Sequence, residues 1–342
     1  MKILLLGGGG FLSSAVERRL DRGGHHLTVL NRTGRTVCPR TRPAAGDRYR
    51  AGILEELAED GYDGIVDFLC FRPDHARQAV AAFAGRAARH VMISTGSVYW
   101  CTGEWCNPVG EDQYARAQVD EKPPTPLTPG SVEFAYGAGK RAAEDLLDAA
   151  CRRGDLLSVR LRFPVVGGPG DPSGRYAGYL RRVADGGPVV LPDGGFNTFR
   201  HLYVEDAAAA VEAALVREGL EGGGYNVASR EIVSVRDMIR CLAQLLRRPV
   251  PEVVGVPSDC LRRWGMEDLF APFSCRGSQI LDWSRAAREL GFAPTPYQDW
   301  LAETVRRAPA AANGPGAAGG RRQSREAEAG AVRRYQATLE AA

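Results

Sequence analysis

The sequence predicts an α/β fold, a doubly wound parallel sheet with a smaller C-terminal α/β lobe. Short apolar runs of strand length alternate with amphipathic helical segments through the first half of the chain. Such alternation implies right-handed crossovers between parallel strands. A run of glycines from Gly7 to Gly10 separates the first apolar run from the first helical segment. Ligands bind at such strand-to-helix turns, at the carboxyl edge of an open parallel sheet.

Composition sets the class of protein. The chain has 342 residues, of which 44% are hydrophobic and 25% are charged, as is usual for a globular protein. A net charge of +3 gives no argument for a nucleic-acid or membrane partner. Apolar runs such as Ile3 to Leu6 are too short to span a bilayer, and Met1-Lys2 leads straight into a strand, which leaves no room for a signal peptide. We therefore expect a cytoplasmic protein.

The cysteines support that expectation. All eight are scattered along the chain, without the clustering of a disulfide framework or a zinc site. Cys101 and Cys106 are the only close pair, and no histidine accompanies them. We expect reduced thiols and no metal site.

The elements of the expected sheet follow from the pattern in chain order. Apolar runs predict strands at 2–6, 26–31, 63–69, 90–94 and 157–162. Periodic apolar positions predict helices from Phe11 to Leu20 and at 53–59, 74–89 and 133–152.

The later elements would form the smaller lobe, facing the carboxyl edge of the sheet. They are helices near 175–184, 206–216 and 233–246 and strands at 200–204 and 225–227. Residues 308–320 have the Ala, Pro and Gly composition of a flexible linker. Residues 321–342 form a tail that is expected to be helical or disordered, or to dock on a partner subunit in a homodimer.

Tyr136 and Lys140 are the candidate catalytic pair. Residues four apart lie on one face of a helix, so a phenol and an ammonium can share one small volume. A nearby cation favours the phenolate and would lower the phenol pKa from about 10. A hydroxyl from Thr95, at the end of the fourth strand, could complete a set that holds an alcohol or ketone oxygen. By itself, such a pair is more often a solvated surface pair.

The order of the motifs decides between these interpretations. Three motifs follow one another along the chain: a glycine loop after the first strand, Ser94-Thr95 at the end of the fourth strand, and a Tyr-x-x-x-Lys helix. This order resembles the extended short-chain dehydrogenase/reductase family, the NAD-dependent epimerase/dehydratase group. The resemblance runs from Met1 to about residue 307. It implies a single Rossmann unit over 1–307, with a cofactor part of about 1–165 and a substrate lobe of mainly 166–307.

The resemblance implies a dinucleotide cofactor. Gly7 and Gly10 match the family pattern Gly-x-x-Gly-x-x-Gly, in which Ser13 replaces the third glycine. The expected cofactor contacts are Gly7, Gly10, Phe11, Leu12, Asn31, Arg32, Asp47, Arg48, Tyr136, Lys140, Pro164 and Val166. At the end of the second strand, Asn31-Arg32 stands where an acidic residue would bind the ribose of NAD. We therefore expect NADP, with NAD as the alternative in which Arg32 is solvated or stacks on adenine.

The family also implies roles in the reaction. Thr95 lies four residues before Tyr99, the position of the family's catalytic Ser or Thr; Tyr136 would be the acid/base and Lys140 would hold the nicotinamide ribose. Gly96-Ser97 replaces the Asp-Glu pair of the family's dehydratases, which argues against water elimination. Ser97 and Arg200 are the candidate substrate contacts. Val165 replaces a substrate-binding Asn, whereas Arg200 resembles the family's diphosphate clamp or is a plain surface arginine.

Two function classes stay open. The first is an epimerase or ketoreductase acting on a secondary alcohol or ketone of a sugar, by expectation nucleotide-linked, or of a related polyol. Arg32 favours the reductase, because epimerases more often retain NAD. The second is a non-catalytic Rossmann-fold binding protein, including an RNA-binding one, against which the intact Thr95, Tyr136 and Lys140 and the near-neutral charge argue.

One long connection completes the expectations. Residues 100–134 are rich in Pro and Gly and carry the aromatic side chains of Trp100, Trp105 and Tyr114. Loops of this length are often functional lids. The aromatic residues would either wall the substrate pocket or simply anchor the loop on the core.

Overall fold

The chain folds into two compact units. The computed structural model describes residues 1–102, 105–116, 119, 132–266, 270, 277–308 and 325–340. The first unit comprises Met1–Val166, His201–Ser229 and Leu281–Pro294, and the second comprises Gly167–Arg200, Arg230–Ile280 and Thr295–Ala342. The first unit therefore takes up two later segments, 201–229 and 281–294, from the range expected to form the smaller lobe.

A seven-stranded sheet forms the middle of the first unit. Its strands are β1 (Lys2–Leu6), β2 (His26–Asn31), β3 (Arg42–Ala45), β4 (Tyr62–Asp67), β5 (Ala87–Thr95), β6 (Ser158–Phe163) and β11 (Gly223–Asn226). They lie in the order β11-β6-β5-β4-β1-β2-β3, and each neighbouring pair is parallel. Ile3 to Leu6 are fully buried, as expected for a central strand covered on both faces. The predicted doubly wound fold is confirmed.

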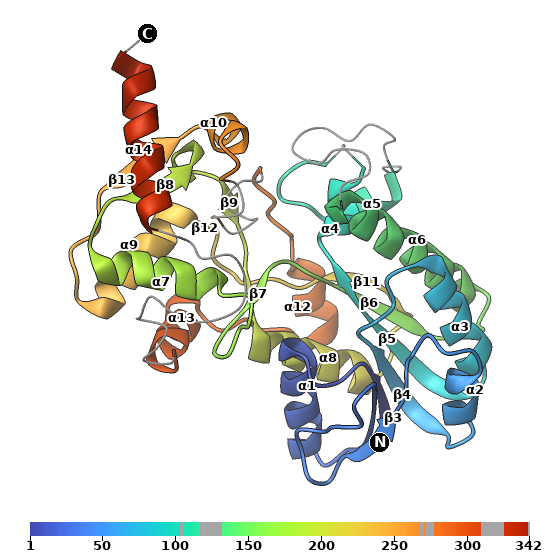
Figure 1. Cartoon of the computed structure of the whole chain (residues 1–342). Coiled ribbons are helices and arrows are strands. Elements are labelled where there is room, and N and C mark those ends of the chain that lie inside the picture. The colour runs from blue at the N-terminus through green and yellow to red at the C-terminus, as the bar shows by residue number, and fades with distance from the viewer. Residues whose placement is uncertain are drawn as a thin grey trace. The chain divides into compact units, whose positions relative to one another are not determined.

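Helices cover both faces of this sheet. The helices of the first unit are α1 (Phe11–Arg22), α2 (Ile53–Ala58), α3 (Pro73–Phe83), α4 (Ser97–Trp100), α5 (Asp112–Arg116), α6 (Val132–Arg152), α8 (Val204–Val216) and α12 (Ser284–Leu290). Figure 1 shows α1 and α8 together on one face and α2, α3 and α6 on the other. The carboxyl ends of the strands thus open onto the loops that carry the candidate site.

One helix and two strands depart most clearly from the sequence-based expectations. The helix expected at 74–89 ends at Phe83, because Gly85 adopts φ +66° and the chain turns into β5 at Ala87. Strand β3 was missed; it contains Pro43, which an edge strand tolerates. The strand expected at 200–204 is instead two short pieces, β9 (Thr198–Phe199) and β10 (Leu202–Tyr203).

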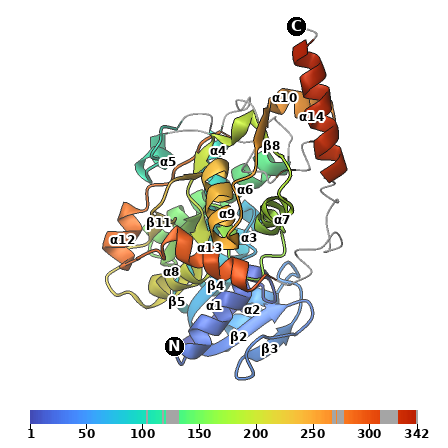
Figure 2. The same ribbon diagram turned by 90° about the vertical axis from the view of Figure 1, so that its left-hand side faces the viewer.

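The second unit is built from short strands and helices. It contains α7 (Arg175–Asp185), β8 (Val189–Pro192), the 3-10 turn Asp193–Gly195, β9, β12 (Val233–Ser234), α9 (Val235–Leu246), β13 (Val253–Val256), α10 (Ser258–Arg263), α13 (Tyr297–Arg306) and α14 (Arg325–Glu340), and β7 (Val166–Gly167) spans the boundary. Strands β8 and β13 pair in parallel, and β9 and β12 pair antiparallel. Helix α9 packs against α7 and α13 (Figure 2).

The C-terminal tail contributes a helix to the second unit. Helix α14 packs on β8 and β13, and its Glu328 forms a buried ion pair with Arg182 of α7 at 2.7 Å. Most of the linker expected at 308–320 lies outside the described residues. None of the helices in the described part of the chain combines the length and apolar character that crossing a lipid bilayer needs.

Candidate active site

The glycine loop joins β1 to α1 in a conformation that favours glycine. Gly7 and Gly9 have φ values of +102° and +80°, which side chains rarely adopt. A Cβ on Gly8 would collide with Val29 of the neighbouring strand β2. Gly10 caps the 12-residue helix α1, and the N–H groups of a first helical turn, which have no partner within the helix, can bind a pyrophosphate. The loop therefore fits a dinucleotide.

Ser13 explains the missing third glycine. Its hydroxyl accepts a hydrogen bond from the Gly10 N–H at 3.0 Å and lies 3.3 Å from the Gly10 carbonyl oxygen. The side chain is buried within the first turn of α1, where Phe11 and Leu12 are half-buried. The serine thus closes the loop by hydrogen bonding instead of by the absence of a side chain.

Asn31 organises the loop at the end of β2. Its Oδ1 accepts hydrogen bonds from the Thr33 N–H at 3.0 Å, the Thr33 hydroxyl at 2.9 Å and the Arg35 N–H at 3.3 Å. Its Nδ2 donates to the Arg35 carbonyl at 2.7 Å and would lie 3.0 Å from a Cβ on Gly8. The glycine loop and the Asn31 loop are therefore neighbours, and Arg32 is exposed on the latter.

Asp47 and Arg48 have different environments. Asp47 is exposed and accepts a hydrogen bond from the Tyr49 N–H at 2.9 Å. Arg48 is only 2% exposed and donates to Asp67 Oδ2 at 2.8 Å, to the His75 carbonyl at 2.7 Å and to the Gln78 side chain at 2.7 Å. The Arg48 guanidinium is therefore held by partners within the first unit.

The predicted catalytic side chains come together at the end of β5. The Tyr136 side chain of α6 lies close enough to Thr95 for the two hydroxyls to interact, and Tyr136 is 39% exposed. Thr95 Oγ1 lies 3.2 Å from the Ser97 hydroxyl and accepts from the Ser97 N–H at 3.2 Å. The Lys140 Nζ lies 6.0 Å from the centre of the Tyr136 ring. One small volume thus holds three hydroxyls beside an ammonium.

Burial shifts the pKa of both ionisable groups. Burial lowers the pKa of Lys140 to about 8, and this residue is only 1% exposed. Burial raises the pKa of Tyr136, and the hydrogen bond with Thr95 opposes that rise. The expectation of a lowered Tyr136 pKa is therefore wrong for this structure, because the ammonium donates to the Ile93 carbonyl at 2.6 Å and not to the phenol.

The glycines between Tyr136 and Lys140 bring α6 close to its neighbours. A Cβ on Gly137 would lie 2.5 Å from the Ser97 carbonyl oxygen, and a Cβ on Gly139 would lie 2.7 Å from the Phe71 carbonyl oxygen. Side-chain carbons essentially never approach so closely, so both positions need glycine. The small residues thus place the catalytic turn of α6 against the loops that follow β4 and β5.

Phe71 is a site residue that the sequence analysis missed. Its ring lies 4.5 Å from the Lys140 Nζ and 6.2 Å, centre to centre, from the Tyr136 ring. A cation over an aromatic face is stabilised by the ring quadrupole. The available signal was an aromatic residue a few positions after a buried strand, at the carboxyl edge of the sheet.

The other predicted residues are distributed over both units. Pro164 and Val166 follow β6 and are partly buried in the first unit, where the Val165 carbonyl accepts from the Leu202 N–H at 3.0 Å. Arg200 is partly buried and closes the first segment of the second unit.

Part of the proposed lid is anchored on α6. The Tyr114 hydroxyl lies 2.8 Å from Asp145 Oδ1 and 3.0 Å from the Arg141 carbonyl, and the Arg141 guanidinium lies 3.8 Å from the Tyr114 ring centre. Trp100 and Trp105 contact each other edge to face, with ring centres 4.9 Å apart. These contacts agree with the anchoring interpretation. Residues 103–104, 117–118 and 120–131 of this segment lie outside the described residues.

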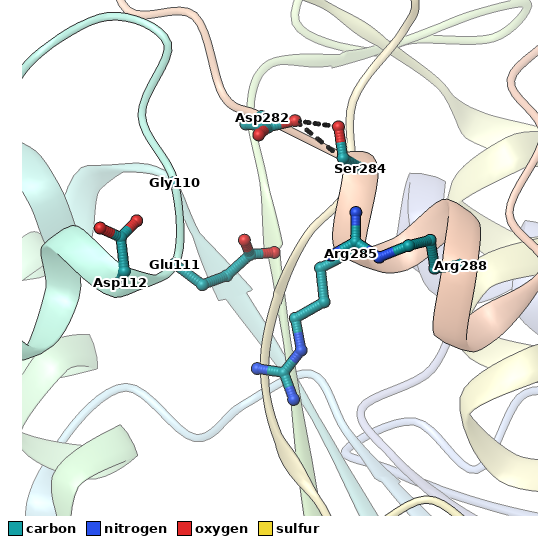
Figure 3. A pocket seen from close by; sticks show the side chains of 7 residues that line it. All are labelled: Gly110, Glu111, Asp112, Asp282, Ser284, Arg285 and Arg288. Carbon is teal, nitrogen blue, oxygen red and sulfur yellow. Dashed lines mark hydrogen bonds between the residues drawn. The ribbon is translucent and has the colours of Figure 1, made fainter.

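A separate charged pocket of about 460 Å³ lies elsewhere in the first unit. Glu111 and Asp112 line it on one side, and Arg285 and Arg288 of α12 line it on the other (Figure 3). None of the predicted site residues belongs to it, and its charged groups are largely engaged; Arg285, for example, pairs with Glu289 at 3.1 Å.

Comparison with known proteins identifies the family of this chain. Residues 3–228 match the model of the NAD dependent epimerase/dehydratase family. The chain belongs to that family. As a member of the epimerase/dehydratase family, it is an NAD(P)-dependent enzyme, an oxidoreductase or isomerase, as the sequence predicted.

The relatives of this epimerase/dehydratase-family chain include an epimerase and a reductase. It is 25% identical to a dTDP-L-rhamnose 4-epimerase of Burkholderia thailandensis, over 75% of this chain and 85% of the relative. It is 26% identical to a 2-alkyl-3-oxoalkanoate reductase of Stenotrophomonas maltophilia, over 73% of this chain and 77% of the relative.

A solved structure confirms the fold of the family. UDP-glucuronic acid 4-epimerase of Bacillus cereus, in complex with NAD, superimposes with a TM-score of 0.67 at 20% identity, over 90% of this chain and 96% of that one. That neighbour was solved in complex with NAD.

Proposed function

We propose that this enzyme transfers hydride at a secondary alcohol or ketone of a nucleotide-linked sugar, and that it is an epimerase. The observation that carries the proposal is the cluster of Tyr136, Thr95 and Lys140 at the carboxyl end of β5. An epimerase oxidises a hydroxyl to a transient ketone and returns the hydride to the opposite face. The named substrates of the relatives support a nucleotide sugar.

The side chains divide the proton chemistry among them. A bound dinucleotide, held by the glycine loop and Lys140, would supply the hydride chemistry. Tyr136 takes the proton from the substrate hydroxyl as the phenolate and gives it back as the phenol; it is exposed, whereas Lys140 is buried. Thr95 holds the same substrate oxygen by a hydrogen bond. Lys140, with a pKa of about 8, is mostly charged at neutral pH and its ammonium favours the phenolate.

The cofactor that we propose is NADP, with NAD as the alternative. No carboxylate stands at Asn31-Arg32 to repel a 2′-phosphate, and Arg32 and Arg35 are both exposed on the loop that Asn31 organises. Arginine suits a phosphate because its donors bind two oxygens at once.

Net ketoreduction is the second candidate. It would use the same Tyr136 and Thr95 with an exchangeable NADPH, and the preference for NADP proposed above favours it. The reductase among the relatives is a further argument. Water elimination is not proposed, because Gly96 and Ser97 offer no carboxylate acid and base.

Two measurements separate these candidates. Native mass spectrometry of the purified protein should find retained dinucleotide for an epimerase and free protein that binds added NADPH for a reductase. The protein is then incubated with UDP-glucose, UDP-glucuronic acid and dTDP-L-rhamnose, and epimers are identified by NMR. If Tyr136→Phe turns over the reactive sugar at the wild-type rate, the proposed mechanism is wrong.

A further inference from the structure

Helix α6 carries a third polar residue on the face of Tyr136 and Lys140. Glu144 lies one further turn along, and residues at i, i+4 and i+8 follow one side of a helix. Glu144 is as deeply buried as Lys140. The proposed mechanism gives this carboxylate no role, yet burying a charge is costly unless it is paired and hydrogen-bonded.

The contacts of Glu144 reach two neighbouring strands. Its Oε1 accepts from the Ser94 hydroxyl at 2.5 Å, and its Oε2 accepts from Arg162 Nη2 at 2.7 Å and from Arg162 Nε at 3.0 Å. Ser94 and Arg162 are register partners in β5 and β6. The Glu144 carboxylate therefore links α6 to β5 and β6. Its contact in β5, Ser94, is the residue directly before Thr95.

The partner guanidinium is itself held in place. Arg162 Nη1 donates to the Tyr99 hydroxyl at 2.8 Å, and that hydroxyl donates to Asn226 Oδ1 at 2.9 Å. The Tyr114 ring centre lies 3.9 Å from the Arg162 guanidinium. Arg162 thus cannot follow Glu144 if α6 slides along the sheet.

The pair stays ionised although it is buried. Burial opposes ionisation of Glu144, but the charge and hydrogen bonds of Arg162 outweigh burial and hold the pKa of Glu144 below its usual value. Buried ion pairs are often no more stabilising than apolar pairs of the same size. An apolar contact would tolerate small slides of the helix, whereas a two-point carboxylate–guanidinium pair with a third bond to Ser94 does not.

We infer that Glu144, Arg162 and Ser94 are positioning residues that set the distance between the Tyr136 phenol and the Thr95 hydroxyl. The inference rests on the proposed function, in which these two groups meet at one substrate oxygen. Misplacing reacting groups by about 1 Å can cost about 10²-fold in rate. A catalytic gain of that size can offset the free-energy cost of burying the Glu144 charge.

Two other ion pairs provide matched controls. Asp148 of α6, one helical turn farther from Tyr136 than Glu144, pairs with Arg160 of β6 at 2.5 Å. In the described part of the chain, the side-chain hydrogen bonds and ion pairs of these two residues are with α6 and β6 only. Glu328 and Arg182 form an equally buried pair in the second unit. Asp148→Asn and Glu328→Gln therefore weaken ion pairs without touching β5.

The decisive readout needs no substrate. In full-length protein labelled with ¹³C at the tyrosine Cζ, the Tyr136 signal is assigned with Tyr136→Phe and titrated in wild type, Ser94→Ala, Glu144→Gln and the double variant. We expect Ser94→Ala and Glu144→Gln each to raise the Tyr136 pKa by half a unit or more, with the double variant no worse than the larger single change. Asp148→Asn and Glu328→Gln should leave the titration unchanged. Ser94→Ala removes one hydrogen bond, so it tests the inference even if Glu144→Gln does not fold.

Thr95→Val separates this inference from the proposed function. If Thr95→Val raises the Tyr136 pKa but Ser94→Ala and Glu144→Gln do not, the positioning role is refuted and the mechanism stands. If Thr95→Val has no effect, the Tyr136–Thr95 contact itself is refuted. With the nucleotide sugar that is turned over, Ser94→Ala should lower kcat about tenfold while KM and cofactor affinity stay within about twofold.

Discussion

At the scale of single residues, the site combines a phenol and an ammonium, and burial disfavours the charged form of both. Tyr136 must lose a proton to act as a base, and Lys140 must keep one to favour the phenolate. Burial raises the pKa of Tyr136 and lowers that of Lys140, so both shifts work against the reactive pair. Approach of the ammonium to the phenol would relieve both shifts together, because each charge stabilises the other.

Removing the phenol oxygen should stop proton transfer. Tyr136→Phe keeps the ring contact with Phe71 and should lower kcat by about 10²-fold or more, the scale of general acid–base catalysis. Its cofactor affinity, measured by calorimetry, should equal that of wild type. Lys140→Ala should lower both kcat and cofactor affinity, and an unchanged affinity would contradict the proposed ribose contact.

The Lys140 pKa also predicts how stability depends on pH. Between its folded value of about 8 and its ordinary value of 10.5, the unfolded chain holds more of this proton than the folded chain. Stability from this group therefore rises with pH across that window, by about 3 kcal/mol in total. The free energies of unfolding of wild type and Lys140→Met are measured in urea from pH 7 to pH 10.5. The value for Lys140→Met minus that for wild type should fall by that amount as the pH rises. A constant difference would mean that the buried ammonium keeps its ordinary pKa.

Arg32 should decide between the two cofactors. Loss of a charge-assisted hydrogen bond of about 1.5–3 kcal/mol predicts that Arg32→Ala weakens NADP binding by about 10- to 100-fold and leaves NAD binding nearly unchanged. Calorimetry with both cofactors measures this. Arg86→Ala, which removes another exposed positive charge of the first unit, is the control. Equal small losses for both cofactors would argue for NAD.

At the scale of elements, close packing of α6 depends on two missing side chains. Gly→Ala inside a helix ordinarily stabilises by about 1 kcal/mol. At Gly137 or Gly139 the added methyl would meet a backbone carbonyl oxygen at 2.5 or 2.7 Å, so destabilisation by about 1–3 kcal/mol is expected instead. Around Gly330 of α14, no described atom outside the backbone of its own helix turns lies within 4 Å of the ideal Cβ, so Gly330→Ala should be neutral or stabilising. Thermal unfolding of the three variants tests this contrast.

The same elements show what a sequence can and cannot predict. The glycine loop and the Tyr136–Lys140 spacing are local patterns, so the parallel α/β fold and the family followed from them, and Thr95, Tyr136 and Lys140 were chosen as the candidate catalytic side chains. The role of Glu144 depends on which strands are neighbours in the sheet, and a linear pattern does not show that. Arg48 was expected to contact the cofactor, which stays a prediction. Its buried partners, Asp67 and Gln78, come from distant segments, so the local pattern could not reveal them.

At the scale of the whole molecule, the C-terminal helix is part of the second unit. Ala331 of α14 packs with Val190, Val256 and Phe270, and Glu328 is buried against Arg182. Truncation after residue 308 would expose this cluster and leave Arg182 as a buried charge without Glu328, a loss of about 3–5 kcal/mol. Calorimetry should show a lower unfolding temperature for the truncated protein, with unchanged cofactor affinity because the cofactor loop lies in the first unit. An unchanged unfolding temperature would mean that the helix does not stabilise the second unit.

The division of the chain into interleaved segments has a consequence for biosynthesis. The first unit needs residues 201–229 for α8 and β11 and residues 281–294 for α12, and each stretch follows a segment of the second unit. A growing polypeptide emerges from the N-terminus, so the seventh strand cannot close the sheet edge beside β6 until long after β1 has been made. During that interval the β6 edge is open to wrong partners. No single cut yields either unit as one continuous piece, so neither can be produced alone by simple truncation, and a chaperone that shields the open edge should raise the yield of folded enzyme.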